Sequence, residues 1–476
     1  MTEEGTPIGC RVEKDTLGPV PVPADRYYGA QTARALHFFD IGEEKVPAEF
    51  VRALGLVKKA AAIANYRLGL LSQQTMEWIV AAAEEVLKGK LDDHFPLHIW
   101  QSGSGTQTNM NCNEVIANRA IELAGGVLGS KTPVHPNDHV NLSQSSNDVI
   151  PTALHVALAC GLVERLFPEL EALVGTLEKL GSDFGGIIKI GRTHLMDALP
   201  ISLGYELLGY AAQLRVGWNA VRHGLEGLYS LPIGGTAVGT GFNAPPKFGQ
   251  LVVEHLRECT GLPFEVATNR ASLIAGHEPL LVVSSAFRTL AASLWKVAND
   301  IRWMASGPRC GLAEITIPEN EPGSSMMPGK VNPTQCEALI MVALQVIGND
   351  LTIGVAGAQG NFELNTCKPL LIHCLLGSLR LLVDGCRSFR LHCLTGLAPN
   401  RERLRQLVNQ SLMLVTALVP KLGYDRAAEI ALLAHRQGIS LREAALRTGY
   451  LTETEFDALV RPERMVGPWE SEKENL

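Results

Sequence analysis

The chain has 476 residues, 46% hydrophobic and 19% charged, as in soluble globular proteins, and this length predicts two or three structural regions. Its net charge of −7 comes without any block of lysine and arginine, so nucleic acid is not an expected partner. No uninterrupted apolar run reaches the roughly 20 residues of a membrane span, and the first residues lack a secretion signal. We therefore expect a cytoplasmic location and no membrane partner.

Residues 1–46 are rich in proline, glycine and charge, which predicts irregular structure with one short strand at most. Helices are predicted from Pro47 to about Leu70 and from Gln73 to Leu87. A turn of glycine, serine and threonine at 103–109 should lead into another helix. The segment Val134–Asp138 is predicted to be a loop.

Long helices then dominate the middle of the chain. The clearest repeats apolar residues in steps of three and four, namely Leu280, Val283, Phe287, Leu290, Leu294, Val297, Ile301 and Met304. Five such helices are expected, with one interrupted at Pro168. No strand–helix alternation appears, which argues against a doubly wound sheet and for a bundle whose helices are buried on several sides, as between subunits.

After about Asn400 the pattern changes to short helices that break at Gly423, Gly438 and Gly449, followed by a charged tail at 470–474 that we expect to fray. The sequence thus predicts a mostly α fold in three regions. Residues 1–144 form an N-terminal, mainly helical domain, residues 145–398 a central long-helix bundle, and residues 399–476 a small C-terminal helical domain.

Ten cysteines are scattered along the chain, and none forms a Cys-x-x-Cys motif. Most are expected to act as small buried hydrophobes rather than as disulfides or as zinc or cluster ligands. The pairs His373-Cys374 and His392-Cys393 are poor metal candidates, because adjacent residues on a helix point in different directions. We therefore predict no metal and no cofactor.

Four patches combine hydroxyls, amides and glycine at predicted helix starts: Ser104-Gly105-Thr106, Ser145-Ser146-Asn147, Gly191-Arg192-Thr193-His194 and Gly323 to Pro333. Asn332 and Pro333 fit the N-cap and first position of a helix, where N–H groups beside Lys330 suit a carboxylate or phosphate. Each patch alone could be an ordinary cap or turn. Together they favour a site that holds a small dianion through many directed hydrogen bonds.

His194 is the natural titrating group near neutral pH, and Glu337, one turn into the helix after the fourth patch, could orient it. The alternative for His194 is a structural histidine. Sequence alone does not bring these two residues together.

The segment Gly323-Ser-Ser-Met-Met-Pro-Gly-Lys-Val-Asn-Pro333 resembles the signature of the fumarase/aspartase lyase superfamily, and the other three patches match that family's further blocks in the same order. The resemblance covers about Arg11 to Gly467. Within the superfamily, the chain is most similar to the class II fumarases. His194 stands where aspartases have Gln, Gly329 where they typically have Ala, and the segments Thr334–Ala338 and Gly360–Asn365 are fumarase-like.

The resemblance implies a homotetramer with a central bundle of long helices from four subunits, and active sites assembled from three subunits. It implies His194 and Ser324 as catalytic residues, with Glu337 as the partner of His194. The substrate-binding residues it implies are Ser104, Gly105, Thr106, Ser145, Ser146, Asn147, Thr193, Ser325, Lys330, Val331 and Asn332. A secondary dicarboxylate site would comprise His135, Pro136, Asn137 and Asp138.

The implied reaction is the reversible hydration of fumarate to (S)-malate, a step of the tricarboxylic acid cycle, without a metal. A base removes a proton from C3, and an acid protonates the departing C2 hydroxyl. A serine can serve as the base only where a nearby cation, N–H donors and exclusion of water support it. We hypothesise Ser324 as the base and His194, through a water, as the acid side.

Several positions depart from the usual fumarase pattern. Met196 and Tyr205 stand where Gln is common, 270–274 reads Arg-Ala-Ser-Leu-Ile, and Thr132 and Pro133 replace residues that are often basic beside His135. Three alternatives stay open. They are aspartate ammonia-lyase or another aminosuccinate lyase of the same superfamily, a catalytically silent structural protein with this fold, and a metal- or cluster-dependent hydratase.

Overall fold

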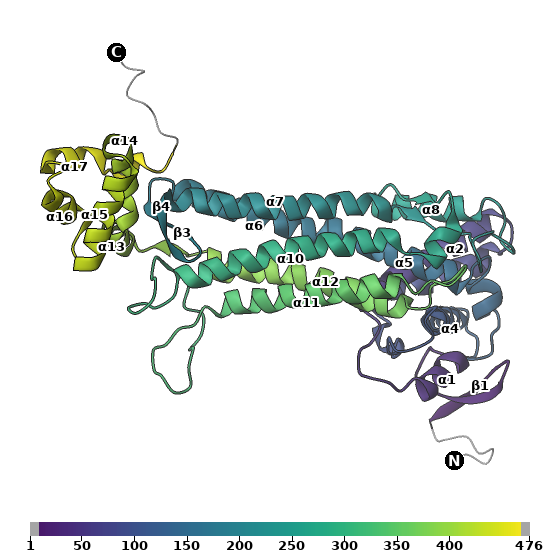
Figure 1. Ribbon diagram of the computed structural model, residues 1–476. Helices are drawn as coiled ribbons and strands as arrows, with labels where there is room; N and C mark the ends of the chain where they lie inside the picture. Colours follow the sequence, from purple (N-terminus) through teal and green to yellow (C-terminus); the bar gives the residue numbers. More distant parts are fainter. Residues whose placement is uncertain (1–8, 468–476) are drawn as a thin grey trace. The chain divides into compact units, whose positions relative to one another are not determined.

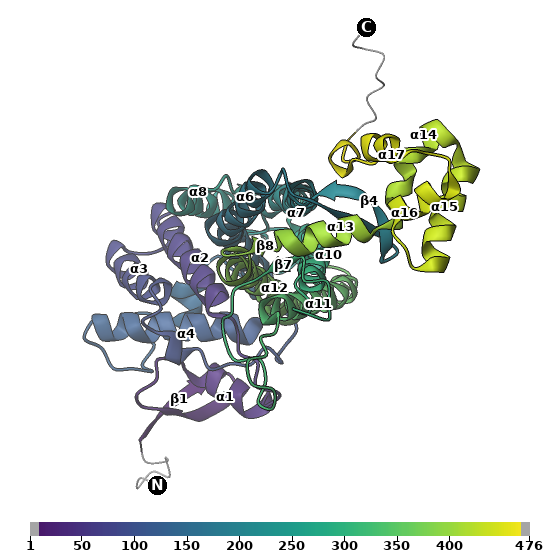
Figure 2. The same ribbon diagram turned by 90° about the vertical axis from the view of Figure 1, so that its left-hand side faces the viewer.

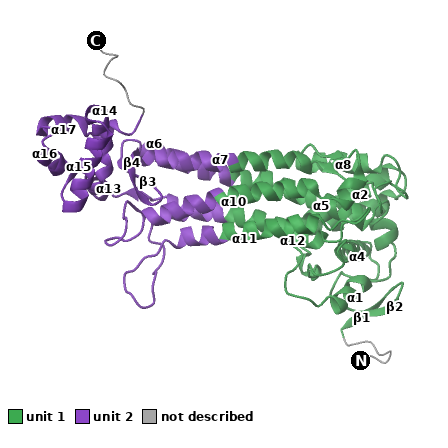
Figure 3. Ribbon diagram, in the orientation of Figure 1, with its two compact units in different colours: residues 1–168, 217–292, 342–384 green, residues 169–216, 293–341, 385–476 purple. Residues whose placement is uncertain are grey.

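Helices dominate the structure, a computed structural model that describes residues 9–467 (Figure 1). The chain divides into two compact units, coloured separately in Figure 3. Unit 1 comprises residues 1–168, 217–292 and 342–384, and unit 2 comprises residues 169–216, 293–341 and 385–476. The mostly α prediction is therefore confirmed. The predicted domain boundaries after residues 144 and 398 stay predictions.

The N-terminal part of unit 1 is more regular than the sequence indicated. Strands β1 (Cys10–Asp15) and β2 (Gly18–Pro23) form an antiparallel hairpin, and helix α1 (Ala30–Phe38) follows. The prediction of irregular structure was wrong here because a hairpin can tolerate prolines on strands that leave one edge unpaired. The predicted fraying of 470–474 lies outside the described residues.

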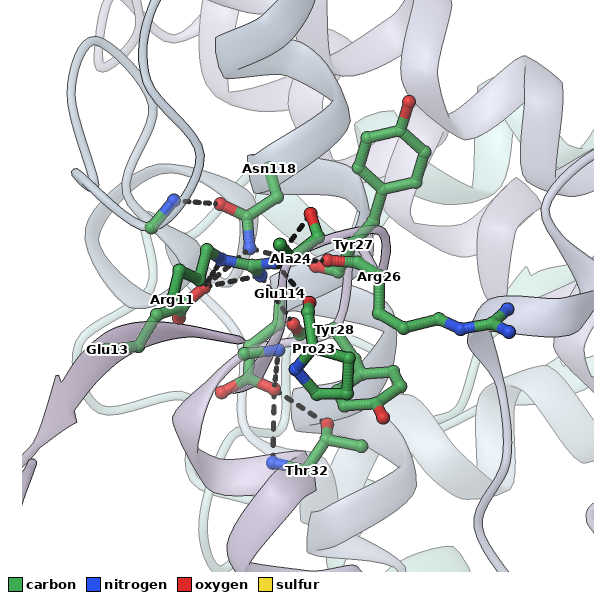
Figure 4. Close-up of polar contacts among 12 residues, drawn as sticks. Arg11, Glu13, Pro23, Ala24, Arg26, Tyr27, Tyr28, Thr32, Glu114 and Asn118 are labelled. Atoms are coloured by element: carbon green, nitrogen blue, oxygen red, sulfur yellow. Dashed lines mark hydrogen bonds and ion pairs between the residues drawn. The ribbon is translucent and has the colours of Figure 1, made fainter. Parts of the chain in front are cut away.

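A buried polar network fixes this corner of unit 1 to helix α4 (Thr106–Leu123), as Figure 4 shows. The carboxylate of Glu114 on α4 accepts hydrogen bonds from the backbone N–H groups of Gly29 (2.9 Å), Gln31 (2.8 Å) and Thr32 (3.1 Å). These are the free donors at the start of α1, so Glu114 caps that helix from another element. Arg11 donates to the carboxylate of Glu13 and to four backbone carbonyls around it.

Helices α2 (Ala48–Arg67) and α3 (Gln73–Leu87) agree closely with the prediction. Helix α2 packs against α5 and also against α3 and α8, which are labelled beside it in Figure 2. Helix α5 (Ser146–Gly161) continues through a π-helical turn (Leu162–Leu166) into α6 (Phe167–Asp183). The predicted interruption near Pro168 is therefore a change in hydrogen bonding, because a π-helical turn ends just before the proline, which has no N–H to continue the α-helical pattern.

The long helices α7 (Leu203–Leu228), α10 (Glu278–Met304), α11 (Thr334–Gly357) and α12 (Lys368–Phe389) each run from one unit into the other. Every member of the predicted seam on α10, from Leu280 to Met304, is buried. This confirms the three-four spacing as a core-facing stripe. Helix α12 begins four residues later than predicted.

Short elements complete the two units. Unit 1 also contains a 3₁₀ turn (Asp92–His94), α8 (Phe248–Thr260), α9 (Arg270–Ala275) and the parallel pair β5 (Ser230–Leu231) and β6 (Glu265–Val266). Unit 2 contains the antiparallel pairs β3 (Ile188–Thr193) with β4 (Met196–Ser202) and β7 (Ile315–Thr316) with β8 (Ala398–Pro399).

The C-terminal part of unit 2 has its own apolar core. Its helices are α13 (Arg401–Gln410), α14 (Val419–Leu422), α15 (Tyr424–Gln437), α16 (Leu441–Thr448) and α17 (Glu453–Leu459), with 3₁₀ turns at Leu412–Leu418 and Pro462–Arg464. Leu418, Ile430 and Ala444 are fully buried in this core. The predicted breaks at Gly423, Gly438 and Gly449 are confirmed, because each glycine follows a helix at positive φ.

Four helical segments are long and apolar enough to cross a membrane by length and composition alone: Ser146–Asp183, Glu278–Met304, Thr334–Gly357 and Lys368–Leu394. The expectation that no segment reaches this length was wrong because it counted only uninterrupted apolar runs. Half or more of the most apolar window is buried within the chain in three of them, but only 22% in α11. Helix α11 therefore presents an unusually apolar exposed surface.

Candidate active site

Three of the predicted substrate-binding hydroxyls come together in unit 1. The Oγ of Ser104 lies 2.8 Å from Thr106 Oγ1, which lies 2.9 Å from Ser146 Oγ. Ser102 Oγ extends this chain, 3.1 Å from Ser104. We call Ser102, Ser104, Thr106 and Ser146 the hydroxyl cluster. Hydroxyls can both donate and accept, so the cluster can turn its protons towards an anion.

The hydroxyl cluster joins the first residues of two helices. Thr106 opens α4 after Gly105, whose φ is 77°, and Ser146 opens α5 after Ser145. The Oγ of Ser145 accepts the N–H of Asn147 at 3.2 Å, as an N-cap does. Two helix N-termini that converge in this way concentrate N–H dipoles, which favours a dianionic ligand. The segment Ser145-Ser146-Asn147 can therefore cap helix α5 and also bind an anionic ligand.

Backbone packing beside the cluster depends on Gly103. A Cβ at this position would overlap the carbonyl of Thr366, and Gly103 O accepts the N–H of Lys368 at 2.9 Å. The ammonium of Lys368 is 1% exposed and donates to Asn365 O at 2.9 Å. Burial lowers the pKa of Lys368 to about 7. The sequence analysis missed this lysine, whose only signal was a charged residue at the start of an apolar helix.

Thr193 and His194 lie in unit 2 on the hairpin of β3 and β4. Both are exposed, and His194 and Leu195 form its turn at positive φ (57° and 64°). Beneath the hairpin, the fully buried carboxylate of Glu314 binds Lys189 at 3.0 Å and Arg192 at 2.8 Å. Glu314 thus anchors the strand that presents His194, a role that no sequence motif indicated.

The segment from Gly323 to Pro333 is a mostly exposed loop closed at its base. Gly323 N–H donates to Lys330 O at 2.8 Å, and the Asn332 amide donates to Gly323 O. Helix α11 begins at Thr334, so the predicted N-cap role of Asn332 was wrong, because its side chain turns back into the loop. Gly329 has a φ of 79°, which an alanine at this position would adopt only with strain.

Inside the loop, Ser324 Oγ accepts two backbone N–H groups, from Met326 at 3.2 Å and Met327 at 3.0 Å. Donors aimed at a hydroxyl oxygen stabilise its deprotonated form. Such donors are one of the supports that a serine base needs. The side chains of Ser325, Lys330 and Val331 are exposed on the same loop.

Glu337 lies on the first turn of α11 with an exposed side chain. Among residues 9–467 of a single chain, Glu337 makes no hydrogen bond or ion pair with His194. The predicted pairing of the two residues is thus absent within one described chain and stays a prediction for an assembly.

The predicted secondary site forms a short turn, η2 (Pro136–Val140), where a loop was expected. His135 Nδ1 accepts the N–H groups of Asn137 and Asp138, both at 3.1 Å. An imidazole in this capping role must be unprotonated at Nδ1, and burial lowers the pKa of His135 in the same direction. Only Nε2 remains for a ligand. Binding of a dicarboxylate here stays a prediction.

Comparison with known proteins identifies the class. A family model described as Lyase matches residues 18–348, and one described as Fumarase C C-terminus matches residues 414–467. Curated relatives named fumarate hydratase class II come from Thermosynechococcus vestitus, 58% identical over 96% of this chain and 98% of the relative, and from Bordetella parapertussis, 57% identical over 95% and 98%.

A crystal structure of class II fumarase from Schistosoma mansoni superposes with a TM-score of 0.93 at 44% identity, covering 96% of this chain and 99% of that one. The fold is thus that of a helical lyase. The chain belongs to the class II fumarase family of the fumarase/aspartase superfamily, which confirms the resemblance seen in the sequence.

Proposed function

We propose that this protein catalyses the reversible hydration of fumarate to (S)-malate. The hydroxyl cluster carries the proposal, because it places Thr106 and Ser146 at two converging helix N-termini that suit one carboxylate of a small dianion. Relatives more than half identical over nearly the whole chain bear the name fumarate hydratase. Ser104, Gly105, Ser145 and Asn147 complete this carboxylate site in the proposal.

In the elimination direction, Ser324 removes a C3 proton from malate. The two N–H groups on its Oγ support the alkoxide that this step needs, and Lys330 adds a positive charge on the same loop. Loss of this proton leaves a carbanion whose charge spreads onto the adjacent carboxylate, which then carries two negative charges. Lys330 and Asn332 stabilise this aci-carboxylate, with Ser325 and Val331 as further contacts.

His194 protonates the departing hydroxyl through a water molecule, and Glu337 orients its imidazole. Thr193 binds substrate beside it. Because His194 and Glu337 are both exposed and do not pair with each other among the described residues of one chain, we propose that they meet across a subunit boundary. Each active site then combines segments of three subunits.

The exposed apolar stripe of α11 supports a homotetramer. Met341, Leu344, Leu351 and Val355 recur at helical spacing and are 63%, 47%, 73% and 58% exposed. A stripe of this kind calls for a partner helix, and a bundle formed by several copies would supply one. Cytoplasmic location stays a prediction.

The activity is tested by following fumarate absorbance after adding malate, then aspartate, in the presence of a chelator. Malate should yield fumarate, while aspartate should not. Fumarate from aspartate alone would favour the aminosuccinate lyase, no fumarate from either would favour the silent structural protein, and loss of activity with the chelator would favour a metal-dependent hydratase.

The Ser324→Ala variant should lower kcat by about 10²- to 10⁴-fold while its thermal unfolding changes little, because the two hydrogen bonds that the hydroxyl accepts lie within a mostly exposed loop. Near-normal turnover in a folded Ser324→Ala enzyme would refute the assignment of Ser324.

A further inference from the structure

The segment Asn141–Asp148 leads into α5 and carries Ser145, Ser146 and Asn147. It is held from two sides by charged side chains that are both 0% exposed, Lys58 on α2 and Asp148 on α5. Neither charge belongs to a motif that predicted function. Buried charges are costly, so their presence beside the proposed carboxylate site calls for a reason.

Lys58 binds the start of the segment. Its Nζ donates to Asn141 Oδ1 at 3.0 Å and to Gln144 Oε1 at 2.9 Å. Among the described residues it forms no ion pair, so two neutral amides satisfy a buried cation. Desolvation lowers the pKa of Lys58 to about 8, which leaves the cation dominant at neutral pH.

The Asn141 Oδ1 atom that accepts from Lys58 also contacts helix α4. This oxygen accepts the side-chain amides of Asn109 and Asn113, each at 3.1 Å. Helix α4 begins at Thr106 of the hydroxyl cluster. The contacts around Asn141 therefore tie α2, α4 and the segment before Ser145 into one polar unit, and Lys58 is its only charged member.

Asp148 binds the other end of the segment. Its Oδ1 accepts the N–H of Ser145 at 3.0 Å, and its Oδ2 accepts those of Gly234 at 3.0 Å and Thr236 at 2.8 Å. The same loop receives the Asn147 side chain, whose amide donates to Ala237 O at 2.8 Å. One carboxylate thus fixes both the turn before α5 and the loop that orients Asn147.

We propose that Lys58 and Asp148 are positioning residues that hold Ser145, Ser146 and Asn147 in place for substrate carboxylate binding. The proposal rests on the proposed function of those three residues. Lys58 and Asp148 act on the segment through hydrogen bonds to Asn141, Gln144 and Ser145, so their proposed contribution is geometric. A shift of a binding group by about 1 Å is enough to weaken its hydrogen bonds.

The test compares Lys58→Met and Asp148→Asn with two matched controls. Lys59→Met removes a neighbouring lysine that pairs with Glu84 at 3.0 Å and does not contact the segment. Glu114→Gln alters another buried carboxylate that accepts backbone N–H groups, but at the start of α1 (Figure 4). KM, kcat and thermal unfolding are measured for all four.

Lys58→Met and Asp148→Asn should raise KM for malate about tenfold, with a smaller change in kcat, because a carboxylate site binds the ground and transition states alike. Both controls should keep KM within about twofold of wild type, even where Glu114→Gln loses stability. A purely structural role would lower the folded fraction and so the apparent kcat at unchanged KM, and that result for Lys58→Met or Asp148→Asn would overturn the proposal.

Gln144→Met provides a milder variant if either substitution prevents folding, because it removes only one acceptor of Lys58 and should raise KM severalfold. Calorimetric binding of succinate separates the two proposals. If wild type turns over neither malate nor fumarate, the proposed function fails, and a parallel loss of succinate affinity in the variants still supports the positioning role. Unchanged succinate affinity in them overturns it.

Discussion

Ser324 and His194, the two proposed proton-transfer residues, occupy half-buried and exposed positions of unit 2, whereas the charges that hold the carboxylate site are buried in unit 1. A serine needs donors, and the N–H groups of Met326 and Met327 supply them locally. The residues that react and the residues that position thus differ in burial.

His155 on α5 illustrates a buried group with a large effect on stability. Its Nδ1 lies 3.2 Å from Leu228 O and 3.0 Å from Ser230 O, so the neutral imidazole must donate from Nδ1. Burial lowers its pKa to about 4. The unfolded chain binds the proton near pH 6.5, so the folded state is fully favoured above that pH and loses stability as pH falls towards 4.

We predict that His155 alone lowers the free energy of unfolding by about 3 kcal/mol between pH 7 and pH 4, since each pKa unit is worth about 1.4 kcal/mol. His155→Asn keeps an N–H donor near Leu228 and Ser230 but does not titrate. Urea unfolding at both pH values should show a smaller pH dependence in the variant by that amount. Equal pH dependence in the two proteins would contradict the prediction.

At the scale of single elements, the β3–β4 hairpin stands out because His194 and Leu195 both have positive φ. Two-residue hairpin turns of this kind usually carry Asn-Gly, since residues with a Cβ are strained there. Glu314 and the ion pairs with Lys189 and Arg192 hold the hairpin despite this cost. Backbone strain of this kind is common at residues that a protein holds in a fixed orientation for function.

Leu195→Gly should therefore raise the free energy of unfolding by about 1 kcal/mol, because glycine adopts positive φ without strain. Leu199→Gly, on strand β4 of the same hairpin, is the matched control and should lower it, since glycine weakens a strand. Chemical unfolding of both variants measures the difference. A loss of stability in Leu195→Gly equal to that of Leu199→Gly would show that the turn is not strained.

At the scale of the whole molecule, the exposed stripe on α11 is the strongest sign of assembly. In a single chain, Leu351 and Val355 are largely exposed to water, and only 22% of the most apolar window of α11 is buried. Apolar surface of this extent favours association of copies. In the proposed function, assembly also completes the active site, so oligomeric state and activity should change together.

If α11 lies in the interface of the proposed tetramer, Leu351→Glu should yield smaller species and abolish most activity, because burying a carboxylate in an apolar interface is costly. Tyr424→Glu, at a position 77% exposed on α15, is the control and should leave assembly intact. Sedimentation velocity and the malate assay on the same samples give the answer. A fully active tetramer of Leu351→Glu would exclude this stripe from the interface.

Local patterns in the sequence were enough to predict the long helices and the family, whereas the roles of the site residues stay predictions. The α10 seam and the bounds of α3 followed from three-four spacing, because a helix side chain faces the core at intervals that neighbouring residues reveal. The segment from Gly323 to Pro333 indicated the superfamily because it resembles that family's signature.

Only the tertiary structure decided which residues meet. Thr106 contacts Ser146 across 40 positions of sequence, Lys58 contacts Asn141 across 83, and Asp148 contacts Thr236 across 88. Local periodicity carries no information about such pairs, and a buried lysine looks like any helix lysine until its neighbours are known. The sequence by itself therefore determined the family and the long helices, whereas the folded chain determined the hydroxyl cluster and the buried charges beside it, because contacts distant in sequence arise from packing.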